Sequence, residues 1–92
     1  MKKDTPEILL KGYMMKHGLN PNSLSKLTGL SQTQLRFISR NEMGITAPVA
    51  MRLAKVFGTT PELWMTAGMN LQLQKAGKNK SFMKKLSKLK RL

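Results

Sequence analysis

The spacing of apolar residues predicts helices along most of the chain. Apolar positions recur every three to four residues, in blocks bounded by Gly, Pro, Ser, Thr or Asn, and this is the period of an amphipathic helix. No stretch alternates apolar and polar residues for long enough to predict a strand. The sequence therefore predicts an all-α fold with five helices.

The first two predicted helices have clear start and stop signals. The first opens at Thr5–Glu7, with Thr5 as N-cap and proline in the first turn, and it ends near Gly18. Its apolar residues form one broad face that we expect to be buried (Leu9, Leu10, Tyr13 and Met14). The second helix is short, from about 22 to 28, and Gly29 supplies the left-handed residue that ends it.

The third predicted helix opens with four small polar residues, Ser31–Gln34 (SQTQ). They match a capping box, in which the serine hydroxyl accepts from the backbone N–H of the last glutamine and that glutamine reaches back. Leu35 and Ile38 are three residues apart and should face inward. The helix should end at Asn41, a residue type that tolerates the left-handed conformation.

Two further helices complete the predicted domain. Thr46 is the expected N-cap of the fourth, which Gly58 ends, and its apolar residues should supply much of the core (Val49, Met51, Leu53, Ala54, Val56 and Phe57). The fifth opens at 59–62 (TTPE) and runs towards Gly77. Trp64 in this helix is expected to be a core or dimer anchor.

Charge divides the chain into two parts. Its 92 residues hold 17 basic and four acidic side chains, a formal net charge of +13, whereas solubility requires a magnitude of only about 2 to 8 in a small domain. A polyanionic partner is the simplest explanation. Residues 78–92 hold seven of the basic groups and no acid, so we separate a folded domain, residues 1–77, from a basic tail, residues 78–92.

Composition argues against an enzyme. The chain has no cysteine and one histidine, His17, which leaves no thiolate ligands, no histidine-rich zinc site and no cofactor or catalytic constellation to predict. No apolar run approaches the roughly 20 residues of a membrane span, and the lack of cysteine fits the reducing cytoplasm.

Two short helices joined by a tight turn at Gly29, within a basic domain, match the outline of a helix-turn-helix. In that motif the N-terminal end of the second helix enters the major groove. Gln32, Thr33 and Arg36 would then face the base edges, because the apolar residues of the helix must point inward. Contacts to the DNA backbone are predicted for Lys26, Ser31, Gln34, Arg40 and Asn41. The alternative is that SQTQ only caps a helix of a generic bundle.

The basic tail leaves three alternatives. A disordered arm could gain affinity for DNA by counterion release. Phe82, Leu86 and Leu89 would share one helical face, which instead favours a helix that docks on a partner, or one that lies on an anionic membrane surface.

The segment Thr46–Trp64, TAPVAMRLAKVFGTTPELW, resembles the HigA antitoxins, the VapI-like branch of the Xre helix-turn-helix proteins. Four separated blocks match the family pattern in order (Gly44–Thr46, Arg52–Ala54, Phe57–Thr59 and Pro61–Trp64), and the similarity covers roughly residues 6–73. The resemblance implies a dimer that binds paired half-sites of an operator, represses its own operon and sequesters a toxin that cleaves messenger RNA. It also implies that Ser31–Arg36 carry the operator contacts. The basic tail lies outside the pattern.

The sequence therefore predicts a homodimeric, sequence-specific repressor that binds double-stranded operator DNA, and the antitoxin of a toxin–antitoxin pair. Two alternatives differ in kind. One is a protein-interaction module that mainly grips a toxin, and the other is a nonspecific polyanion binder driven by the basic tail.

Overall fold

The structure is a computed structural model, and it describes residues 4–92. This range holds six α-helices and no strand: α1 Pro6–Lys16, α2 Pro21–Thr28, α3 Gln32–Ile38, α4 Ala47–Phe57, α5 Pro61–Lys78 and α6 Lys80–Ser87. The prediction of an all-α fold is confirmed. The prediction of five helices is wrong, because the basic tail contributes a sixth. Within the same range, no helix is long and apolar enough to cross a membrane.

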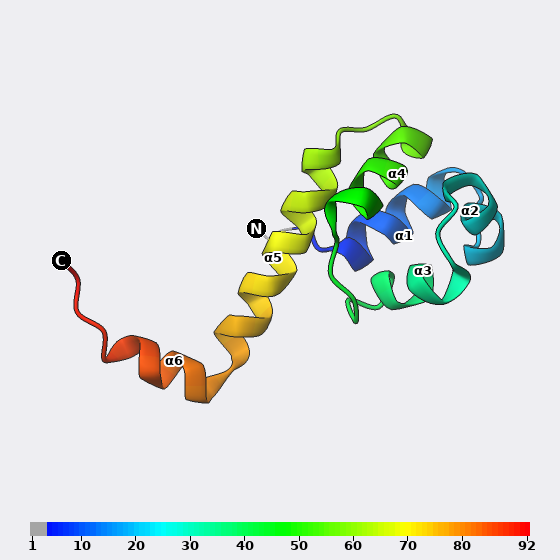
Figure 1. Ribbon diagram of the computed structural model, residues 1–92. Coiled ribbons are helices and arrows are strands. Elements are labelled where there is room, and N and C mark those ends of the chain that lie inside the picture. Colours follow the sequence, from blue (N-terminus) through cyan, green and yellow to red (C-terminus); the bar gives the residue numbers. More distant parts are fainter. Residues whose placement is uncertain (1–3) are drawn as a thin grey trace.

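The helices form a body and an extension (Figure 1). Helices α1 to α4 and the first part of α5 pack together, while the second part of α5 leads away from the body to α6. The molecule is consequently elongated, with extents of 48 × 25 × 23 Å.

The core lies between α1 and the other helices of the body. Its fully covered side chains come from all five of them and include Leu10, Leu24, Leu35, Leu53 and Trp64. The indole Nε1 of Trp64 donates to Thr59 Oγ1 over 2.8 Å, so the buried ring keeps its hydrogen bond. The prediction that Trp64 is a core residue is confirmed.

Met51 was predicted to lie in the core, and this is wrong because its side chain is 61% exposed. Val49 and Leu53 on the same helix are buried. Met51 lies two residues from each of them, which places it about 200° around the helix axis, on the opposite face.

The start of α1 is capped from a distance. Thr5 and Thr46 occupy the predicted N-cap positions, but within the described chain neither hydroxyl caps its own helix. Asn41, which follows α3, accepts from the backbone N–H of Glu7 over 2.8 Å and donates through Nδ2 to Thr5 Oγ1 over 3.1 Å. Asn41 has φ 58°, so the predicted left-handed residue is present, and it also ties the segment after α3 to α1. The prediction that the helix itself ends at Asn41 is wrong, because α3 ends at Ile38.

Candidate nucleic-acid interface

The turn between α2 and α3 is fixed by contacts from outside it. Gly29 has φ 77° and ends α2, as predicted. Arg52 of α4 donates through Nη1 to the carbonyl oxygen of Thr28 over 2.8 Å. A Cβ on Gly29 would lie 2.5 Å from that Nη1, so the turn requires glycine for its backbone conformation, and any side chain there would also displace the Arg52 guanidinium from its hydrogen bond.

Helix α3 is held by one buried face. Leu35 and Ile38 are 1% and 0% exposed, which confirms their predicted inward orientation. Ser31 Oγ accepts from the backbone N–H of Gln34 over 3.0 Å, so the serine half of the predicted capping box is confirmed, whereas the predicted bond from the Gln34 side chain back to Ser31 is not formed in the described chain. A full reciprocal capping box occurs in α2, at Asn20. With its inner face and first turn fixed, α3 presents a defined outer face.

The three predicted base-contacting residues all lie at the start or on the outside of α3. Thr33 and Arg36 are exposed, and Gln32 is half-buried. Gln32 Nε2 donates to Asn22 Oδ1 of α2 over 3.1 Å. Because a side-chain amide carries two N–H groups and a carbonyl oxygen, this bond orients Gln32 and still leaves one donor and one acceptor free.

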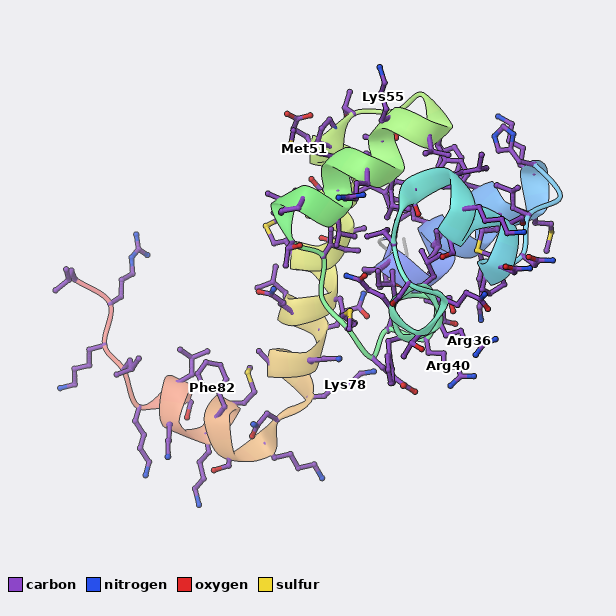
Figure 2. All side chains as sticks on the ribbon, turned by 45° about the vertical axis from the view of Figure 1, so that its right-hand side comes forward. Arg36, Arg40, Met51, Lys55, Lys78 and Phe82 are labelled. Carbon is purple, nitrogen blue, oxygen red and sulfur yellow. The ribbon has the colours of Figure 1, made fainter. Side chains whose placement is uncertain are left out.

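The residues predicted to contact the DNA backbone fall into two groups. Lys26 and Arg40 are exposed and carry free charge, and Arg40 projects from the same side of the molecule as Arg36 (Figure 2). Ser31 and Gln34 lie at the start of α3, joined by the cap. Asn41 is different, because both ends of its amide are already hydrogen-bonded within the fold.

Two positioning residues were missed by the sequence reasoning. Arg52 belongs to one of the blocks that match the family pattern, so its recurrence in that pattern was an available signal. Asn22 carries no such signal, since its contact with Gln32 depends on how the turn at Gly29 brings α2 and α3 together.

The chemistry available on this surface is hydrogen bonding and positive charge. Among residues 4–92, no three potential metal-ligating side chains come together. The described chain has one ion pair, between Lys11 Nζ and Glu7 on α1 at 3.4 Å, and both partners lie outside α3. The guanidinium groups of Arg36 and Arg40 are therefore available to an anionic partner.

Comparison of the sequence with protein families finds a match over residues 10–62 to the Cro/C1-type helix-turn-helix DNA-binding domain. The virulence-associated protein I of Dichelobacter nodosus is 32% identical over 74 residues, which are 80% of this chain and 68% of that protein.

Solved structures resemble the whole chain. An addiction module antidote protein of a HigA family from Coxiella burnetii is 30% identical, with a TM-score of 0.83 and full coverage of both chains. PA4674 from Pseudomonas aeruginosa, solved in complex with its operator DNA, is 26% identical with a TM-score of 0.83, over 99% of this chain and 100% of that one. The similarity thus includes α6 as well as the body.

Proposed function

Because the chain belongs to the family of Cro/C1-type helix-turn-helix DNA-binding domains, we propose that it is a homodimeric repressor whose α3 binds operator DNA, and the antitoxin of a HigB–HigA-type toxin–antitoxin pair. It acts by binding and not as an enzyme. The observation that carries the proposal is the exposure of Thr33 and Arg36 on a helix whose opposite face is buried.

Each base contact follows from the chemistry of the side chain. Gln32 has one N–H and its carbonyl oxygen free, which is the pair of groups needed to address adenine N7 and N6. Arg36 can bind guanine O6 and N7 with both arms of its guanidinium, and Thr33 can place its hydroxyl or methyl against the neighbouring base.

Phosphate contacts would fix the position of α3 without selecting a sequence. We assign this role to the residues at the two ends of α3 and on the preceding helix, namely Lys26, Ser31, Gln34 and Arg40. Asn41 is left out of this set. Its side chain would have to abandon both the backbone N–H of Glu7 and the hydroxyl of Thr5 to reach a phosphate.

The antitoxin role is supported by similarity over the full chain to an antidote protein of a HigA family. Operator binding is supported by the similarity to PA4674, which was solved with its operator. Co-expression with the protein encoded beside it would test the antitoxin role, since a cognate toxin should arrest growth alone and lose this effect in the presence of the chain. Persistent arrest would contradict the role.

Selection of bound sequences from a random duplex pool, at physiological salt, tests the repressor role. A homodimer should select two related half-sites separated by a fixed spacing, about 34 to 36 Å or a multiple. The double variant Q32A/R36A should lose the selected motif, whereas K26A should keep it and bind all sequences more weakly. Selection of no motif by the natural chain would contradict operator recognition. If the natural chain selects no motif and Q32A/R36A still protects cells from growth arrest, the chain would be a protein that mainly binds a toxin.

A further inference from the structure

The basic tail is the most highly charged part of the protein and is fully exposed. Every residue of 78–92 is exposed in the structure, and the segment contains seven basic side chains and no acid. It cannot neutralise itself by internal ion pairs. Charge of this density is costly to hold together unless an anionic partner neutralises it.

The structure gives this charge a defined shape. Asn79 ends α5 and begins α6, with its Oδ1 accepting from the backbone N–H of Phe82 over 3.0 Å. The chain turns at this residue, so that α6 leaves the line of α5 (Figure 1). Lysines and apolar side chains then occupy different sides of α6, with Phe82 on one side and nitrogen-tipped side chains on the other (Figure 2).

The direction and reach of α6 suit a long polyanion that also contacts α3. In Figure 2 the nitrogen-tipped side chains of α6 point to the lower edge of the view, and Arg36 and Arg40 project at the lower right. The long dimension of the molecule is 48 Å, and α6 lies at one end of it, away from the body that holds α3 (Figure 1). With α3 in the major groove, the lysines of α6 would therefore face phosphates outside the base pairs that α3 contacts.

We propose that α6 and the residues after it bind the phosphate backbone of the DNA that flanks the site contacted by α3. The proposal rests on the proposed function, which names DNA as the partner and α3 as the helix that contacts the operator. Lysines at this position would neutralise phosphates and release counterions, which raises affinity for every sequence and steepens its dependence on salt. The tail would therefore strengthen binding without selecting the operator.

DNA fits the tail better than a lipid surface does. α6 has eight residues and buries none of them. Its apolar side comprises Phe82, Met83 and Leu86, which are 45%, 42% and 43% exposed, and Leu89 beyond the helix is 73% exposed. Binding to a membrane interface scales with the apolar area inserted, and this two-turn helix offers only three apolar side chains.

The test compares two full-length triple variants of equal charge. The variant K84Q/K85Q/K88Q removes three lysines from the tail, and K11Q/K16Q/K55Q removes three exposed lysines from α1 and α4. Binding to the selected motif and to random duplex is measured by fluorescence anisotropy over a series of salt concentrations. Circular dichroism checks that both variants stay helical.

The slope of log K against log salt is negative, and we expect its magnitude to be smaller by about 2 to 3 in the tail variant on both DNAs. Each lost phosphate contact contributes about 0.9 to this magnitude. The preference of the tail variant for the motif over random DNA should be unchanged, and the control should match the natural chain. On a duplex trimmed to the motif, the natural chain should lose affinity and the tail variant should not.

Equal slopes for the tail variant and the control would overturn the proposal. So would a tail variant that keeps its DNA slope but loses binding to vesicles containing phosphatidylserine, because the tail would then be a membrane element. A natural chain with no preferred motif, but with the expected fall in slope, would contradict operator recognition and leave the role of the tail supported.

Discussion

α3 and α6 are similar in length and in N-cap but differ in how they pack against the rest of the protein. They have seven and eight residues, and each begins with a side-chain oxygen that accepts a backbone N–H over 3.0 Å, at Ser31 and at Asn79. α3 buries Leu35 and Ile38 against the body, whereas α6 buries nothing. Local sequence alone can therefore begin a helix, and only tertiary packing fixes where its side chains point.

That difference matches two modes of binding DNA. Hydrogen bonds to base edges depend on the positions of donors and acceptors, so neighbouring residues must hold the side chains that make them in place. For α3, these neighbours are Asn22, which bonds Gln32, and Arg52, which bonds the turn before α3. Attraction to phosphates depends mainly on charge and distance. A mobile or weakly anchored helix is sufficient for it.

The largest test of the comparison uses one aromatic residue from each region. Trp64 is fully buried and Phe82 is 45% exposed. W64A should lower the free energy of unfolding by about 3 to 5 kcal/mol, because a large cavity opens in the core. F82A should change it by less than about 0.5 kcal/mol. Urea unfolding followed by circular dichroism measures both, and similar losses would mean that α6 is packed in solution.

The next largest loss of stability is expected when a glycine of the body, Gly29, is replaced by alanine. G29A forces a residue with Cβ into φ 77° and into the space of Arg52 Nη1. The left-handed conformation costs about 1 to 2 kcal/mol and loss of the charged hydrogen bond about as much again, so the unfolding free energy should fall by about 2 to 4 kcal/mol.

Gly77 is the matched control. It lies in α5 with nothing within 4 Å of an added Cβ, and alanine is the better helix former. G77A should therefore leave the midpoint of thermal unfolding unchanged or slightly raised. A comparable loss in both variants would contradict the difference between the two regions.

A pair of asparagines tests the caps. N41A removes the cap of α1 and places alanine at φ 58°, which together should cost about 2 kcal/mol. N41G relieves the backbone and loses only the cap, so it should cost about 1 kcal/mol. N79A removes an equivalent cap from α6 and should reduce helical ellipticity slightly without changing the denaturation midpoint. If N41A and N41G lowered the free energy of unfolding equally, the left-handed conformation at position 41 would carry no cost for alanine.

Local features of the fold were predictable from the sequence. The caps, the apolar period and the left-handed residues that follow the first four helices, at Gly18, Gly29, Asn41 and Gly58, are encoded within a few residues of one another. For this reason Gly29, Leu35 and Ile38 were placed correctly. The order of the basic tail was left open, since a helix with no buried face has no tertiary contact for a sequence pattern to reveal.

Contacts between distant segments were not predictable in the same way. Asn41 lies 34 residues from Glu7, whose N–H it accepts, and Arg52 lies 24 residues from Thr28. Each depends on the final positions of two helices. Asn41 could be identified as a left-handed residue but not as the cap of α1, and this is why a phosphate contact was predicted for a side chain that the fold already uses.

The smallest test concerns one arginine from each region. Arg36 and Arg91 are both exposed, so neither change should unfold the protein. R36A should cost about 1 to 3 kcal/mol on the selected motif and relax one base position, because a forked contact to guanine is lost. R91A should weaken motif and random DNA alike and lower the salt slope by about 0.9.

Titrations of both variants on both DNAs, followed by a second selection with each, separate these outcomes. If R36A weakened motif and random DNA equally, Arg36 would be a phosphate contact and base recognition would fall to Gln32 and Thr33. If R91A changed the selected sequence, the tail would contribute to recognition as well as to affinity. Direct base contacts would then no longer be confined to the helix that the core holds in place.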